Sequence, residues 1–244
     1  MGTMKSSYAM KSSYAINKKI FILHGWTYSL DKWSVFVDLL KKASFSPVFL
    51  KIPGLTIESN KIWDLEKYST WLEKEISKEK GKIILLGHSN GGRIATYFSV
   101  KHSGKIEKLI LIDSAGIYHK GSLLQIKRFL FGTVAKIGKK FTDSKTLKNF
   151  LYRLAGEKDY QSASANMKKS MLNLIKVDLS PILTKIKVRT LIIWGENDKM
   201  TPLSDGILFN KLIENSQLEV VKGARHSPFY THPKEVLDII KNDF

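Results

Sequence analysis

Residues 82–92 read KIILLGHSNGG, an apolar run that leads straight into a glycine-rich turn. The run is typical of a buried strand, and a helical pattern follows it over about residues 90–101. A Gly-x-Ser-x-Gly sequence between a strand and a helix is the pattern of a nucleophile elbow, which holds a serine hydroxyl above the end of a sheet. Because that turn strains the serine backbone, the residues two positions away must be small, as Gly87 and Gly91 are. The pattern predicts Ser89 as a nucleophile at a helix N-terminus, where partial positive charge favours a developing anion.

Short apolar runs alternate with helical patterns on both sides of this turn. The runs are mostly continuous, which is typical of strands buried on both faces. Strands and helices in alternation predict an α/β fold with a mostly parallel sheet and helices on both faces. The expected strands are 20–23, 47–50, 82–86, 106–112, 188–194 and 217–221, and the expected helices are 31–42, 65–78, 90–101, 205–213 and 233–242.

Residues 117–180 interrupt this rhythm. They are helical in pattern and rich in lysine, and they contain no convincing strand. A connection of about 60 residues is too long for a plain loop. We therefore expect a core formed by residues 16–116 and 181–244, with a helical insertion between these two parts.

The first 15 residues contain a tandem repeat, since MKSSYA occupies positions 4–9 and again positions 10–15. The repeat lacks the apolar central region of a secretion signal. We interpret residues 1–15 as an artificial extension or a disordered tail and leave them out of the fold prediction.

Composition limits the chemistry and the partners. The 244 residues include no cysteine, which excludes disulfides, thiolate metal sites and a cysteine nucleophile, and which suits a cytoplasmic location. No apolar run approaches the roughly 18–20 residues of a membrane span, so no stable membrane association is expected. The net charge of +18 comes mainly from lysine, with only five arginines among 40 basic residues. Nucleic-acid readers usually rely on arginine, so we interpret the excess as a solvated surface and expect no nucleic-acid partner. Attraction of anionic substrates, lipids or nucleic acid is the alternative.

A serine hydroxyl becomes a good nucleophile only when a base lies within hydrogen-bond reach and an acid orients that base. After a nucleophile elbow these partners come later in the chain, the acid first. The loop GEND at residues 195–198 offers Glu196 and Asp198 as acids, and His226 follows the last expected strand. Asp113, at the end of an earlier expected strand, is a third candidate acid.

The serine turn, the acidic loop and two histidine-bearing loops occur in an order found in a known superfamily. With His24-Gly25 ahead of the turn and His226 near the end, the chain resembles the α/β hydrolases, in particular their small capped esterase-like members. The resemblance covers about residues 20–244 and implies the α/β-hydrolase fold. It also implies that residues 117–180 form a helical cap over the site.

The same resemblance implies a role for each site residue. Asp198 is the expected acid and His226 the expected base for Ser89, an arrangement that hydrolyses carboxylic esters through an acyl-enzyme. The oxyanion requires backbone N–H donors, which are expected from Asn90, directly after the nucleophile, and from Trp26, in the loop after the first strand. A small-molecule ester is the expected partner, and neither a cofactor nor a metal is expected.

Other activities are compatible with the same three side chains. A carbon–carbon bond hydrolase, a thioesterase or a perhydrolase would use them in the same way, and a ligand receptor of this fold could keep them intact. The sequence predicts neither the acyl and alcohol specificity nor the oligomeric state.

The remaining histidines and one aspartate have structural interpretations. His24 is expected to organise its loop by hydrogen bonding, and His88 to line the sheet or a pocket without an assigned chemical role. Asp205 is expected at the start of a helix. The histidines expected at the surface are His102, His119 and His232.

Overall fold

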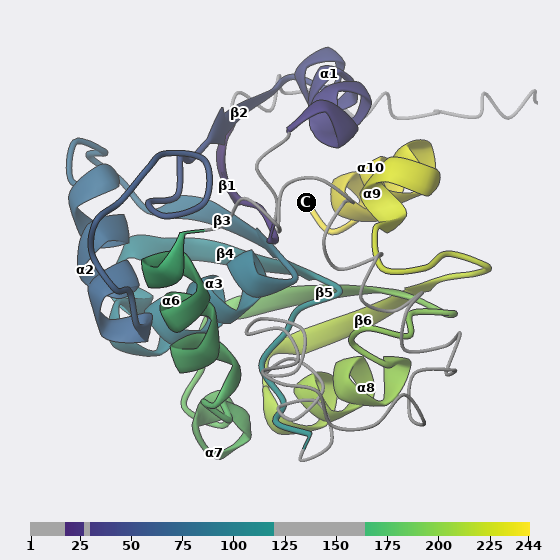
Figure 1. The fold of residues 1–244 in the computed structure, drawn as a ribbon. Coiled ribbons are helices and arrows are strands. Elements are labelled where there is room, and N and C mark those ends of the chain that lie inside the picture. The colour runs from purple at the N-terminus through teal and green to yellow at the C-terminus, as the bar shows by residue number, and fades with distance from the viewer. Residues whose placement is uncertain (1–17, 27–29, 120–163) are drawn as a thin grey trace, which may run out of the picture.

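The computed structural model describes residues 18–26, 30–119 and 164–244, so residues 1–15 and most of the expected insertion lie outside it. Its strands form one six-stranded parallel sheet in the order β2-β1-β3-β4-β5-β6 (Figure 1). The predicted parallel sheet is therefore confirmed. The strands are β1 (Lys18–Leu23), β2 (Phe45–Phe49), β3 (Ile83–His88), β4 (Ile106–Ile112), β5 (Arg189–Gly195) and β6 (Ser216–Val221).

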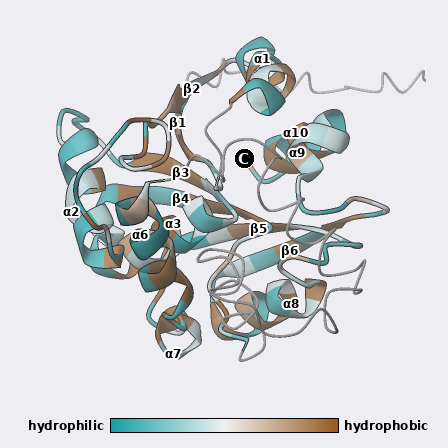
Figure 2. Cartoon of the chain, viewed as in Figure 1, coloured by the Kyte–Doolittle hydropathy of each residue, from teal (hydrophilic) through white to brown (hydrophobic). Residues whose placement is uncertain are grey.

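Helices cover both faces of the sheet. Successive strand residues point to opposite sides, and here the residues on both sides are apolar and must be buried. In β1, Ile20 and Ile22 pack in a cluster with residues of α1, α9 and α10, whereas Phe21 and Leu23 pack with residues of α2, α3, α6 and α8. Figure 2 shows hydrophobic and hydrophilic stretches on α1, as expected for a helix with one buried face. The helices are α1 (Ser34–Lys42), α2 (Leu65–Glu75), α3 (Asn90–Lys101), α6 (Ala165–Ile175), α7 (Ser180–Leu183), α8 (Leu203–Leu212), α9 (Pro228–Thr231) and α10 (Pro233–Asn242), with short 3-10 turns at Asp31–Trp33 and Ser103–Lys105.

The predicted strands and helices are present, but several ends differ. β2 begins at Phe45 rather than at residue 47 because its ladder with β1 starts at the pair Lys18 and Phe45. α2 ends at Glu75, short of the predicted residue 78. α9 was not predicted, because a helix of four residues is too short to show a periodic pattern.

The described end of the expected insertion is helical, as the pattern predicts. α6 is attached to the loop before α2, since the backbone N–H of Trp63 donates to Ser170 Oγ at 2.8 Å and Asn166 Nδ2 donates to the carbonyl of Asn60 at 2.7 Å. Within the described ranges, each helix is too short or too polar to cross a bilayer.

The carboxyl ends of the parallel strands bring distant segments together at one edge of the sheet. Ser89 follows β3, Asp113 follows β4, Asp198 lies in the loop after β5, and His226 lies in the loop after β6. The candidate residues from four separate loops therefore share one edge.

Candidate active site

Ser89 lies in a strained turn between β3 and α3. Its φ of 52° and ψ of −120° fall in a region that side-chain-bearing residues rarely adopt. Glycines make room for this turn. A Cβ added at Gly87 would lie 2.6 Å from Gly92 Cα, and one added at Gly91 would lie 2.1 Å from the carbonyl oxygen of Leu23. The turn thus requires small residues where the sequence has glycine.

Ser89, His226 and Asp198 lie in hydrogen-bond contact. His226 Nε2 is 2.9 Å from Ser89 Oγ, and His226 Nδ1 is 2.7 Å from Asp198 Oδ2. The carboxylate can only accept from Nδ1–H, so Nε2 of the neutral ring carries the lone pair that faces the serine hydroxyl. The geometry suits proton transfer from the hydroxyl to the ring.

Asp198 is buried and fully hydrogen-bonded. One oxygen accepts from the backbone N–H groups of Met200 (2.7 Å) and Thr201 (3.2 Å), and the other from Thr201 Oγ1 (2.7 Å) and His226. Burial alone would raise the pKa of Asp198, but these hydrogen bonds and the nearby imidazole hold it below its ordinary value. Sequence reasoning missed Thr201, although an Asp-x-x-Thr pattern is a known side-chain-to-backbone turn.

The two alternative acids make other contacts. Asp113 is fully buried with a φ of 43°, and its Oδ1 accepts from the backbone N–H of Gly195 at 2.8 Å. Burial, followed by the charge of Asp198, raises the pKa of Asp113 well above its ordinary value. Glu196 accepts from the backbone N–H of Gly223 at 2.8 Å and is exposed. Within the described part of the chain, neither carboxyl group forms a hydrogen bond with the His226 ring.

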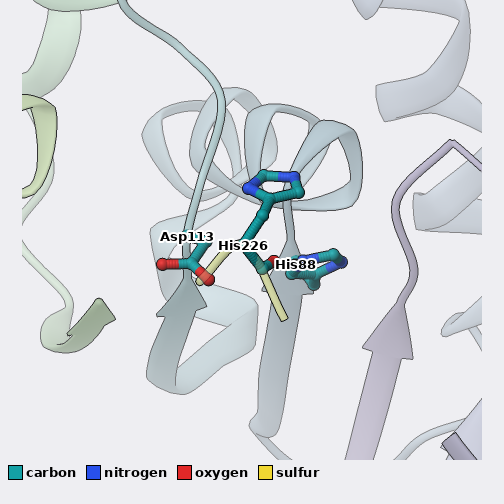
Figure 3. Close-up of side chains that lie close together, drawn as sticks. All are labelled: His88, Asp113 and His226. Carbon is teal, nitrogen blue, oxygen red and sulfur yellow. Dashed lines mark hydrogen bonds between the residues drawn. The ribbon is translucent and has the colours of Figure 1, made fainter. Parts of the chain in front are cut away.

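His88 supports the loop that carries His226. Its Nε2–H donates to the backbone carbonyl of His226 at 2.8 Å, and burial lowers its pKa to about 3. Figure 3 shows His88, Asp113 and His226 close together. Their possible metal-ligating atoms all lie within 4.8 Å of one another. Both ring nitrogens of His226 already contact Ser89 and Asp198, however. The cluster therefore fits a support for His226 better than a metal site.

The expected oxyanion donors lie beside Ser89. Trp26 and Asn90 both line the cavity next to the serine. Asn90 is the first residue of α3, where the backbone N–H has no partner within the helix. The loop of Trp26 approaches closely, since a Cβ added at Gly25 would lie 3.0 Å from Ser89 Cβ. Among the described residues, neither backbone N–H donates to another backbone group.

A cavity of about 110 Å³ opens beside Ser89 and His226. Most of its wall is apolar, which suits the hydrocarbon part of a ligand. α6 supplies three of these side chains. The apolar lining consists of Trp26, Ala115, Ile117, Met171, Leu174, Ile175 and Met200.

Three further polar side chains line the cavity and were not predicted as site residues. Asp205 does lie in the first turn of α8, as expected, but it is buried and faces His119. His119, expected at the surface, is half-exposed, and its Nε2 lies 3.0 and 3.1 Å from the two Asp205 oxygens. The third is Arg93, on α3. Only the contacts between elements reveal these residues.

The parallel sheet, the strained serine turn and the contact between serine, histidine and aspartate are features of one fold family. A family model described as alpha/beta hydrolase fold matches residues 18–233. The chain therefore belongs to the α/β-hydrolase family, as the resemblance predicted.

Individual relatives agree with this assignment. The chain is 28% identical to a pimeloyl-(acyl-carrier protein) methyl ester esterase from Wigglesworthia glossinidia brevipalpis, over 91% of this chain and 92% of the relative. It is 24% identical to a 2-hydroxy-6-oxononadienedioate/2-hydroxy-6-oxononatrienedioate hydrolase from Escherichia coli (strain K12), over 93% and 86% respectively. A solved esterase structure from Exiguobacterium antarcticum has a TM-score of 0.73 at 20% identity, over 92% and 91%, which shows a shared fold.

Proposed function

We propose that this protein is a serine hydrolase that cleaves carboxylic esters through an acyl-enzyme. The observation that carries the proposal is the continuous contact from Ser89 Oγ to His226 Nε2 (2.9 Å) and from His226 Nδ1 to Asp198 Oδ2 (2.7 Å). The strained turn and the apolar cavity beside the serine support it.

In the first step, Ser89 Oγ attacks the ester carbonyl carbon while His226 Nε2 accepts the hydroxyl proton. The carbonyl oxygen becomes an oxyanion, and the backbone N–H groups of Trp26 and Asn90 are its proposed donors. The imidazolium, stabilised by Asp198, then gives its proton to the leaving alcohol as the ester C–O bond breaks. The acyl group remains on Ser89.

In the second step, water attacks the acyl carbon and gives a proton to His226 Nε2. The second oxyanion collapses, the acyl–Ser89 bond breaks, and the imidazolium returns its proton to Ser89 Oγ. The carboxylic acid leaves and the enzyme is regenerated. Every proton that moves passes through one ring nitrogen.

The relatives bear on the substrate class. The relative from Wigglesworthia is named as a methyl ester esterase, which favours ester hydrolysis. Carbon–carbon bond hydrolysis is the second candidate, because the Escherichia coli relative is named as a dienedioate hydrolase. We further propose that residues 117–180 form a cap, since α6 from that segment lines the cavity. The proposed partner is a small-molecule ester in the cytoplasm, without nucleic acid or a stable membrane attachment.

A substrate panel separates the two activities. We expect hydrolysis of p-nitrophenyl acetate, butyrate or octanoate, and a loss of at least about a thousandfold in kcat/KM for Ser89→Ala. A dienoate ring-cleavage product serves as the competing substrate. Faster turnover of the dienoate than of every ester would favour the second candidate. Equal ester turnover by the wild type and Ser89→Ala would overturn the proposed nucleophile.

A further inference from the structure

Arg93 is a buried cation in the wall of the candidate active site. It lies on α3, four residues after Ser89, and lines the same cavity as that serine. Only 3% of its surface is exposed. One guanidinium nitrogen, Nη1, donates to the backbone carbonyl of Val177 at 2.5 Å. Among the described residues, this is the one side-chain hydrogen bond of Arg93.

The charge of Arg93 persists despite its burial. Burial lowers the pKa of the guanidinium to about 10, while the charge of Asp178 acts in the opposite direction. The side chain is therefore cationic at neutral pH. A buried charge is costly unless an opposite charge or several hydrogen bonds compensate it, so one carbonyl leaves this guanidinium under-compensated.

The nearby carboxylates of the described chain are engaged elsewhere. Asp178 accepts from the backbone N–H groups of Tyr118 and Ser180 and from Ser180 Oγ. The carboxylate of Asp205, in the same cavity, faces His119 through both oxygens. Neither forms an ion pair with Arg93. The cavity thus combines apolar walls with a cation that forms no ion pair among the described residues.

We propose that Arg93 is an anion-binding subsite and that the preferred substrates are esters carrying a second, free carboxylate, such as monoesters of short dicarboxylic acids. This inference rests on the proposed ester hydrolysis. The planar guanidinium presents paired N–H donors that match a carboxylate, and an apolar linker would contact the walls of the cavity. A cavity of about 110 Å³ suits a short linker between the two groups.

If Arg93 has only a structural role, its replacement should have a different effect from the one that an anion-binding role predicts. In that case its contact with Val177 would only join α3 to the segment after α6. Replacing Arg93 would then lower stability without changing the preference between charged and neutral substrates. The ratio of two kcat/KM values therefore distinguishes the roles.

The test compares monomethyl adipate with methyl hexanoate, which has the same number of acyl carbons but no carboxylate. Because hydrogen bonds to a charged group are strong, we expect the wild type to prefer monomethyl adipate by at least about tenfold in kcat/KM. Arg93→Met should abolish most of this preference, and Arg93→Lys should retain part of it. Arg225→Met, which removes an exposed arginine near His226, is the matched control and should keep the wild-type ratio.

A binding measurement keeps the inference testable apart from catalysis. Adipate should raise the melting temperature of Ser89→Ala, and the rise should disappear in the Ser89→Ala, Arg93→Met double variant. An Arg93-dependent rise without any ester turnover would keep the subsite and overturn the proposed hydrolysis. Ester turnover with no charged-substrate preference and no adipate effect in the wild type would overturn the subsite, even if the Arg93 variants do not fold.

Discussion

At the scale of single residues, Asp198 and Asp113 show how surroundings assign different states to two buried carboxyl groups. Hydrogen bonds to Asp198 outweigh burial and keep its pKa low, whereas burial dominates at Asp113 and raises its pKa. Pairs of acids whose pKa values diverge in this way are typical of catalytic sites. The ionised group is the one in contact with His226.

This difference predicts opposite consequences for two isosteric changes. Asp198→Asn should lower kcat/KM for an ester by about 10³- to 10⁴-fold, because an amide no longer holds the imidazole in the required tautomer. Asp113→Asn should cost less than about tenfold, because an amide resembles the protonated carboxyl group. Steady-state kinetics of the two purified variants provide the check. A larger loss for Asp113→Asn would move the role of the acid to Asp113.

Some site residues could be predicted from the sequence and others could not. Ser89, Asp198 and His226 follow from a short motif and from the order of loops after strands, and the structure brings these three side chains into contact. Arg93 carries no such local signal, and the Asp-x-x-Thr pattern that includes Thr201 indicates a turn but not a site residue. Arg93 lies in an ordinary helical pattern, and its burial depends on a contact with a segment 84 residues away.

At the scale of elements, the approach of α3 to the loop after β1 fixes the turn that carries the serine. A Cβ at Gly91 would lie 2.1 Å from the Leu23 carbonyl oxygen and 2.5 Å from that of His24. Both contacts are to backbone, which cannot move aside as a flexible side chain can. α3 can therefore pack this closely against the end of β1 only because Gly91 has no side chain.

Gly91→Ala should consequently destabilise the fold. We expect a loss of at least about 2 kcal/mol, which corresponds to a fall in melting temperature of roughly 4–8 °C for a chain of this size. Gly104→Ala is the matched control, because nothing lies within 4 Å of the added Cβ. Thermal melting of both variants checks this. Equal melting temperatures would contradict the close packing of α3 on the β1 loop.

Most elements could be predicted from apolar runs, but their ends depend on tertiary contacts. The continuous run in β3 and the helical pattern of α3 are local signals, and both elements are present. The start of β2 is set by its ladder with β1 instead. The four residues of α9 are likewise fixed by packing, since Phe229 stacks on Trp33 with ring centroids 3.6 Å apart.

At the scale of the whole molecule, two neutral histidines buried near the sheet edge link folding to pH. Burial lowers the pKa from 6.5 to about 4 for His24 and to about 3 for His88. The unfolded chain binds protons at these histidines below pH 6.5, whereas the folded protein binds them only near pH 4 at His24 and near pH 3 at His88. The stability that the two neutral histidines contribute is complete above pH 6.5. It is lost as pH falls toward about 4 for His24 and about 3 for His88. Asp113 acts in the opposite direction because its pKa is raised in the folded protein. Its contribution to stability falls as pH rises above the ordinary pKa of an aspartate.

The contribution of one histidine can be isolated with His24→Asn. The amide can still donate to the Gly25 carbonyl, which His24 Nδ1 contacts at 2.7 Å, but it does not titrate. Relative to the wild type, the variant should gain up to about 1.4 kcal/mol per pH unit between pH 6.5 and 4. Urea unfolding at pH 7.5 and pH 4.5 measures this difference. The same difference at both pH values would show that His24 is not buried in its neutral form.

The most direct test of the central claim is labelling by a fluorophosphonate probe, which reacts with an activated serine and reports its position by peptide mapping. We predict stoichiometric labelling at Ser89 in the wild type and in Ser103→Ala, and none in Ser89→Ala. Labelling of His226→Ala should be strongly reduced, because the base is lost. A folded wild-type protein that does not react, or that reacts equally well as Ser89→Ala, would contradict the account.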